Sequence, residues 1–110
     1  MSSIRERLQG RWRITETGTW DSDDLDLVEP AFIAFEPNGA GEFRFVAVVA
    51  GLDCAYSQTD VGFRFQGSDE GDEVFGEGWA EADGADTIHG EIAFWNGDET
   101  TFKARRWPRS

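Results

Sequence analysis

The sequence is poor in the residues on which several common kinds of site depend. Cys54 is the only cysteine and His89 the only histidine among 110 residues. A single cysteine excludes an internal disulfide and a zinc site with four cysteine ligands, and we expect Cys54 to pack as a small apolar group. The chain also lacks the Gly-x-Ser-x-Gly, His-Glu-x-x-His and phosphate-loop motifs. We therefore expect no enzyme, no metal and no cofactor; an acid-base role for Tyr56 or Glu16 has no motif behind it.

Basic residues are scarce, with 10 Lys and Arg against 22 Asp and Glu, which gives a formal net charge of -12. Such a charge repels phosphate backbones and anionic lipid surfaces, so we expect neither nucleic acid nor a membrane as partner. No apolar run approaches membrane-spanning length, and the charged segment "MSSIRERLQ" lacks the apolar centre of a signal peptide. We expect a soluble, cytoplasmic protein whose residues 1–110 form one domain around one core.

What the chain does contain is a series of short aromatic and β-branched stretches, separated by turn signals at intervals of about ten residues. A helical turn is expected at residues 2 to 9, ending at Gly10. The predicted strands are residues 10 to 19, 30 to 36, 41 to 50, 52 to 58, 61 to 67, 73 to 82, 86 to 95 and 99 to 107. Hairpins without a helical crossover favour an all-β fold, a single eight-stranded antiparallel up-and-down barrel that closes its first strand against its last.

Alternation along the strands assigns side chains to the lumen or to the outer face. In the third strand, Phe43, Phe45, Ala47 and Val49 share the inward face. In the sixth, we favour the small residues Val74, Gly76, Gly78 and Ala80 as the inward set, because the alternative buries Glu77. The aromatic residues expected in the lumen are Phe43, Phe45, Tyr56, Phe63, Phe65, Phe94 and Phe102. A barrel of eight strands either is filled by such side chains or holds one small ligand, and the sequence leaves both open.

A Gly-x-Trp at the start of the first strand, formed by Gly10 and Trp12, follows the expected helical turn, and Arg106 lies late in the last strand. This combination resembles the calycins, the superfamily of lipocalins and fatty-acid-binding proteins. The resemblance implies that Trp12 packs at the closed end of the barrel and that Arg106, or less favourably Arg105, lies across its ring in a cation-π contact. The chain departs from the family in its short length, in lacking the C-terminal helix of lipocalins, and in lacking the helical lid of fatty-acid-binding proteins.

A basic seam is expected where the first and last strands pair. Arg11 and Arg13 then lie beside Lys103 and Arg105, and like charges that face one another across strands are destabilising. Three partners are open: intramolecular carboxylates such as Glu6, an anionic ligand, or the acidic surface of another subunit.

Two functions follow from the barrel and its seam. The first is non-catalytic binding of a small apolar or amphipathic ligand in a short barrel. The alternative is an interaction or structural protein with a side-chain-filled barrel that self-associates through the basic seam, and is then a homo-oligomer.

The remaining polar clusters are interpreted as surface features. The acidic loop at 20 to 29 fails the EF-hand pattern, because Leu25 and Asp26 occupy its fifth and sixth positions. We interpret this loop and the tip "SDEGDE" as solvated, charge-rich turns. His89 is expected on the outer face beside Glu91, as a surface or interface histidine.

Overall fold

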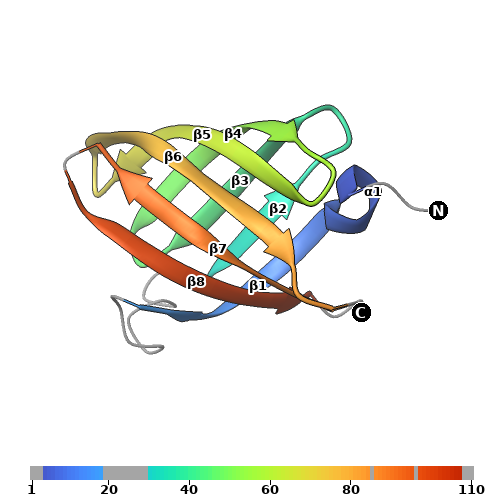
Figure 1. Cartoon of the computed structure of the whole chain (residues 1–110). Coiled ribbons are helices and arrows are strands. Elements are labelled where there is room, and N and C mark those ends of the chain that lie inside the picture. Colours follow the sequence, from blue (N-terminus) through green and yellow to red (C-terminus); the bar gives the residue numbers. More distant parts are fainter. Residues whose placement is uncertain (1–3, 19–29, 85, 96, 108–110) are drawn as a thin grey trace.

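Eight antiparallel strands close into one barrel in this computed structural model, and a short helix precedes them (Figure 1). The structure describes residues 4–18, 30–84, 86–95 and 97–107, except for the side chain of Arg5. The helix is α1 (Ile4–Leu8). The strands are β1 (Gly10–Thr17), β2 (Phe32–Phe35), β3 (Ala40–Phe45), β4 (Val48–Tyr56), β5 (Asp60–Asp69), β6 (Asp72–Ala82), β7 (Thr87–Phe94) and β8 (Glu99–Arg106). The predicted all-β, eight-stranded up-and-down barrel is confirmed, and the predicted loop at 20 to 29 lies outside the described residues.

Closure depends on β1, which pairs with two neighbours. Its first half, Gly10–Arg13, pairs with β2, and the stretch from Trp12 to Thr17 pairs with β8. The register with β8 shifts between Ile14 and Glu16, which indicates a β-bulge at Thr15. The pairing of the first and last strands joins the two edges of the sheet into a closed barrel and places Gly10–Thr17 beside Glu99–Arg106.

Helix α1 lies at one end of the barrel (Figure 1) and packs against β5 and β6. Its side chains Ile4 and Leu8 are buried in the common core, at 8% and 0% exposure. A helix of five residues is too short to be stable alone in water. Its stability therefore comes from its contacts with the barrel.

The boundary between the third and fourth strands was predicted wrongly. The expected strands at 41 to 50 and 52 to 58 are replaced by β3 and β4, with the turn at Val46 and Ala47 and with Gly51 inside β4. Val46 takes a φ of 54°, a conformation that β-branched residues seldom adopt. The stretch contains none of the usual turn residues there, so the sequence favours an uninterrupted strand.

The displaced turn changes which residues face the lumen. Val49, predicted to point inward, is 38% exposed, and Ala47 lies in the turn itself. The neighbours Val48, Ala50 and Leu52 are buried instead. On β6 the favoured assignment agrees with the structure, because Ala80 is fully buried whereas Phe75 is 46% exposed.

Candidate functional site

Aromatic rings fill the lumen of the barrel. The expected lumen rings of Phe43, Phe45, Phe63, Phe65 and Phe102 are only 0% to 4% exposed. A ring that lined a water-sized space would keep accessible surface, so these rings contact other side chains. Centroids of Phe43 and Phe65 lie 4.9 Å apart and those of Phe65 and Phe94 lie 5.2 Å apart, both in edge-to-face arrangements. Phe94 and Tyr56 are half-buried against the same core.

The inward glycines make room for these rings. Gly78 lies directly opposite Phe63 across β5 and β6, and Gly76 lies opposite Phe65. A Cβ atom at Gly78 would lie 2.7 Å from the Phe63 ring, closer than such atoms normally approach. Gly90 and Phe102 repeat the arrangement across β7 and β8. The small residues of β6 thus face inward as predicted, and the space they leave is occupied by phenylalanine.

Trp12 and Arg106 meet at the end of the barrel that carries α1. The Arg106 guanidinium lies 3.9 Å from the centroid of the Trp12 ring. Its two terminal nitrogens donate hydrogen bonds to the carbonyl oxygens of Gln9 at 2.7 Å and of Arg7 at 2.8 Å. Trp12 Nε1 donates to the carbonyl oxygen of Leu8 at 2.9 Å. Trp12 and Arg106 therefore bond to the carbonyls of the last two residues of α1 and of Gln9, the residue that follows the helix.

The hydrogen bonds to α1 are the part of this cluster that sequence reasoning missed. The Gly-x-Trp pattern and the late arginine predict that an aromatic ring and a cation meet at this end of the barrel. They do not predict which backbone carbonyls the Trp12 and Arg106 side chains bind. Arg105, the less favoured candidate for the stack, is exposed on the outer face. The stack and these hydrogen bonds hold the end of the last strand against α1 and the start of β1.

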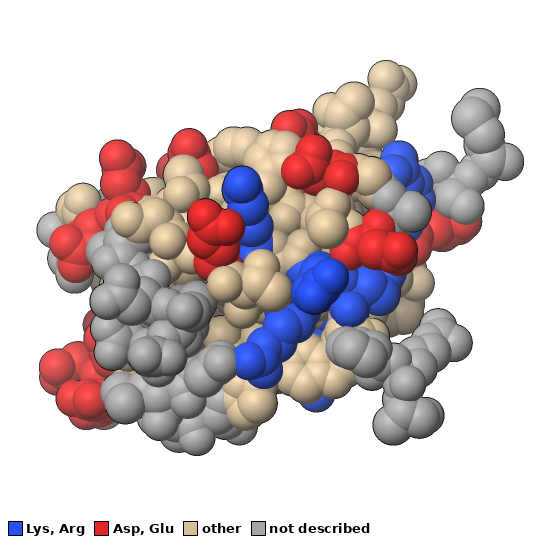
Figure 2. All heavy atoms as spheres, turned by 90° about the horizontal axis from the view of Figure 1, so that it is seen from below, with Lys and Arg blue, Asp and Glu red and all other residues tan. Residues whose placement is uncertain are grey.

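The basic seam occupies the outer face of β1 and β8. Arg13 and Arg105 are direct cross-strand partners, while Lys103 lies opposite Glu16 past the bulge. Figure 2 shows Lys and Arg side chains gathered in a stripe on the side of the barrel where Figure 1 places β1 and β8. Arg11, Lys103 and Arg105 are exposed and Arg13 is half-buried.

The seam also contains two aromatic side chains, Phe32 and Trp107, which were not predicted to belong to it. Trp107 continues the pairing past the end of β8, because its N–H donates to the carbonyl oxygen of Arg11 at 2.9 Å. Its ring meets that of Phe32 edge-on, with centroids 6.5 Å apart. The guanidinium of Arg11 lies 4.6 Å from the Phe32 centroid, and that of Arg13 lies 5.6 Å from the Trp107 centroid. These contacts hold the two arginines in place without neutralising their charge.

Part of the positive charge of the seam has no ion-pair partner among the described carboxylates. The ion pairs shown among the described residues join Arg44 to Glu42, and His89 to Glu81 and Asp83. Within the same described ranges, Lys103 and Arg105 form no ion pair. A positive patch thus persists on a protein whose net charge is -12.

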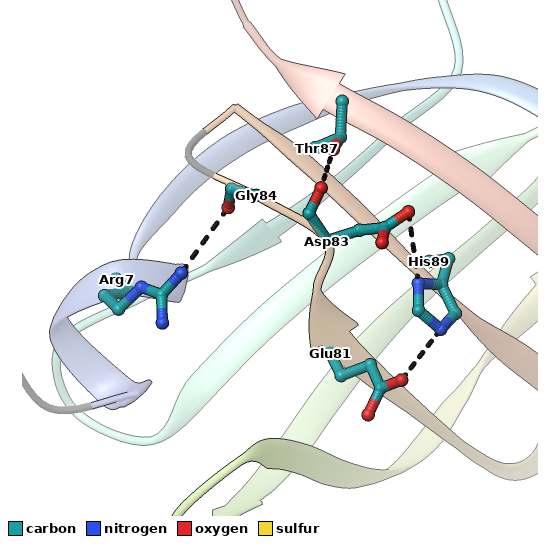
Figure 3. A network of polar contacts seen from close by, with 6 residues as sticks. All are labelled: Arg7, Glu81, Asp83, Gly84, Thr87 and His89. Carbon is teal, nitrogen blue, oxygen red and sulfur yellow. Dashed lines mark hydrogen bonds and ion pairs between the residues drawn. The ribbon is translucent and has the colours of Figure 1, made fainter.

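His89 belongs to a small polar network at the turn between β6 and β7 (Figure 3). Its Nε2 lies 2.9 Å from Glu81 Oε1 and its Nδ1 lies 3.6 Å from Asp83 Oδ2. Thr87 donates to the carbonyl oxygen of Asp83 at 2.6 Å, and Arg7 donates to that of Gly84 at 3.4 Å. The histidine lies on the outer face as expected, but its carboxylate partners come from β6 and the turn that follows. The network connects α1, β6 and β7.

An aromatic pair stands out on the outer face, away from the seam. Phe75 and Trp95 are 46% and 72% exposed, and their ring centroids lie 5.5 Å apart at an interplanar angle of 32°. An open groove of about 1000 Å³ beside them is lined in part by Asp53, Arg64 and Glu77. Trp95 was expected only as the end of a strand, and its position next to an Asn-Gly turn is the signal that indicates an exposed hairpin tip.

Cys54 lies half-buried on β4, against the core. Burial, and secondarily the negative charge of Asp53, raises the pKa of its thiol from 9.0 to about 11. The thiol is therefore protonated at neutral pH, which agrees with an apolar packing role.

Alkylation of Cys54 by iodoacetamide should therefore be slow in the folded protein. Since the thiolate is the reactive form, we expect the rate to rise toward a midpoint near pH 11 when folded, against 9.0 when unfolded. The folded state holds the proton more tightly, so stability is lost as the pH rises through this window. Mass spectrometry of pulse-labelled protein measures the rates, and a folded-state midpoint near pH 9.0 would contradict the assignment.

The described residues show neither a helix long and apolar enough to cross a membrane nor a group of three or more His, Cys, Asp and Glu that could hold a metal ion.

A fold alone does not specify an activity, because one architecture supports many functions. The function of this barrel therefore depends on its side chains. Comparison with protein-family models, with curated proteins and with solved structures finds no match for this chain.

Proposed function

We propose that this chain is a non-catalytic interaction protein with a side-chain-filled barrel, which self-associates through its basic seam. The observation that carries the proposal is the positive patch of Arg11, Lys103 and Arg105, three exposed cations that form no ion pair among the described residues although acidic residues outnumber basic ones by 22 to 10. Exposed like charges held side by side on paired strands repel one another. A partner that supplies carboxylates relieves this repulsion, and most of this protein's own surface charge is acidic.

The filled lumen supports the same choice. A small apolar ligand would have to displace rings that are 0% to 4% exposed and packed against glycines. Protein interiors packed in this way resist changes of even one methylene group. Binding of a small ligand in the lumen stays a prediction, with less support than binding at the outer surface.

We also infer a calycin-like fold for this barrel. The inference rests on the eight-stranded closed topology together with the stack of Arg106 on Trp12 at the end that carries the short helix. We further propose a cytoplasmic location, because a lone cysteine without a disulfide suits a reducing compartment.

Sedimentation velocity at three ionic strengths tests self-association. At about 0.01 M salt the screening length is about 30 Å, so the net negative charges of two copies repel across whole molecules. At about 0.15 M salt the screening length is about 8 Å, so the attraction between oppositely charged patches that face one another outweighs the repulsion between whole molecules. At about 1 M salt the screening length is about 3 Å, and this attraction is screened as well. We expect association to be strongest at the intermediate salt concentration.

The variant Arg11→Gln with Lys103→Gln should remain monomeric at all three salt concentrations. Glutamine keeps most of each side-chain stem, so the change removes charge with little loss of packing. The matched control, Arg7→Gln with Arg44→Gln, changes the net charge equally outside the seam and should associate as the wild type does. A wild type that is monomeric throughout, or a seam variant that sediments like it, would refute the proposal.

A further inference from the structure

A second surface of the barrel has charge opposite to that of the seam. We name it the acidic aromatic face and define it by Asp53, Glu73, Phe75, Glu77 and Trp95. Phe75 and Trp95 are the two most exposed large hydrophobic side chains among the described residues. Exposed aromatic groups surrounded by polar ones are typical of protein interaction sites, where such residues supply much of the binding energy.

The charge of this face is negative although an arginine lies on it. Asp53, Arg64 and Glu77 are successive cross-strand neighbours on β4, β5 and β6. One guanidinium thus stands between two carboxylates, and Glu73 adds a further negative charge beside the aromatic pair. The groove next to Trp95 therefore presents aromatic surface and net negative charge together.

We propose that the acidic aromatic face binds the basic seam of a second copy of this chain. The inference rests on the proposed function and names the surface that the seam contacts. The seam presents the guanidinium of Arg105, the ammonium of Lys103 and the ring of Trp107, while the face presents carboxylates and two exposed rings. Arginine pairs with carboxylates through two parallel hydrogen bonds and stacks on aromatic rings, so each kind of group on one surface has a counterpart on the other.

A second copy is favoured over an unrelated basic partner because it accounts for both surfaces. A cationic peptide on the acidic aromatic face would leave the seam of the same molecule without carboxylates. In a contact between two copies, the basic seam of one copy meets the carboxylates of the acidic aromatic face of the other. Two seams or two faces carry like charge and repel one another, so this contact is selected over both of those.

The arrangement of the strands determines the kind of assembly. The seam lies on β1 and β8, whereas the face lies on β4, β6 and the residue after β7, so the two surfaces belong to different sides of the barrel. A contact between two different surfaces is heterologous, and it leaves one unused seam and one unused face in every pair. The assembly accordingly grows into a chain or closes into a ring, and does not stop at a two-fold dimer.

Complementation between two variants tests this contact. The seam variant is Arg11→Gln with Lys103→Gln, and the face variant is Trp95→Ser with Glu77→Gln. All four positions are exposed, so both variants should keep the wild-type fold and thermal unfolding midpoint. At intermediate salt we expect each variant alone to associate at least about tenfold more weakly than the wild type. An equimolar mixture should form a one-to-one complex that does not grow, because its remaining surfaces are the two altered ones.

The matched control for the face is Val49→Ser with Glu91→Gln, which removes an exposed apolar side chain and a carboxylate outside the face, and should assemble as the wild type does. A face variant that assembles like the wild type, a control that is equally impaired, or a mixture that stays monomeric would overturn the inference and leave self-association through the seam standing. A wild type that is monomeric at every salt concentration would overturn both.

Discussion

Replacing Trp12 by alanine should lower the free energy of unfolding by about 3 to 5 kcal/mol, the usual cost of truncating a buried aromatic side chain to alanine. Trp12 is 1% exposed, its ring carries the guanidinium of Arg106, and its Nε1 bonds to the carbonyl oxygen of Leu8. The substitution removes all three interactions together. Since small domains are stable by about 5 to 15 kcal/mol, this loss is a large part of the total.

Urea unfolding followed by tryptophan fluorescence measures this loss, with Trp95→Ala as the control. Trp95 is 72% exposed, so the same change of residue type there should alter stability by no more than about 0.5 kcal/mol. Similar losses in the two variants would contradict the central position of Trp12 at the closed end.

The contribution of the Arg106 hydrogen bonds can be measured separately from that of its positive charge. Lysine keeps a cation over the Trp12 ring but lacks the fork that reaches the carbonyl oxygens of Gln9 and Arg7. A lysine ammonium can keep at most one of these two hydrogen bonds. Arg106→Lys should therefore lower the free energy of unfolding in urea by about 1.5 to 3 kcal/mol, the usual contribution of the one charged hydrogen bond that is lost. Arg105→Lys is the control, and should be nearly neutral because Arg105 is exposed.

Most of the hairpins were predictable because residues such as Asn and Gly mark their turns. The count of eight was correct although one break was misplaced: it was expected at Gly51, which lies inside β4, whereas the turn is at Val46 and Ala47, where Val46 takes a φ of 54°. Nothing in "FRFVAVVA" distinguishes a turn from a continued strand, because the conformation is imposed by the pairing of β3 with β4. One misplaced turn was enough to reverse the face of Val49, since side chains alternate with a period of two.

The filling of the lumen was harder to predict than the faces of its strands. Alternation shows that Gly76 and Phe65 both point inward, but not that they lie opposite one another. Their contact depends on the register of the hairpin, which is fixed by its tip at Glu70 and Gly71, both with positive φ. A tight turn of this kind was predictable from "SDEGD", and counting outward from it gives the pairing of Gly76 with Phe65.

The contacts of Arg11 and Trp107 with Phe32 could not be predicted from the sequence. Phe32 lies in the run "AFIAF", where both Phe32 and Ile33 are buried, so the alternation that reveals an outward position is hidden. Its burial comes from Arg11 and Trp107, which reach it from the other end of the chain. Contacts between segments so distant in sequence follow from barrel closure and not from local pattern.

Replacing Phe65 by alanine should also cost about 3 to 5 kcal/mol, and should open an apolar cavity beside Gly76. The Phe65 ring is 3% exposed and packs against the rings of Phe43 and Phe94. An empty cavity lined by such rings stays dry and accepts a small aromatic molecule. We therefore expect benzene to raise the thermal midpoint of Phe65→Ala, while leaving the wild-type midpoint unchanged.

The matched control is Phe75→Ala, which removes the same side chain from the outer face, where Phe75 is 46% exposed. It should lose much less stability and show no benzene effect, because no enclosed cavity forms there. Stabilisation of the wild type by benzene would mean that the lumen opens to small apolar molecules at little cost, and it would favour the ligand-binding hypothesis over a filled barrel. Stabilisation confined to Phe65→Ala would mean that the Phe65 ring itself occupies this part of the lumen, and it would favour binding of partners at the outer surface.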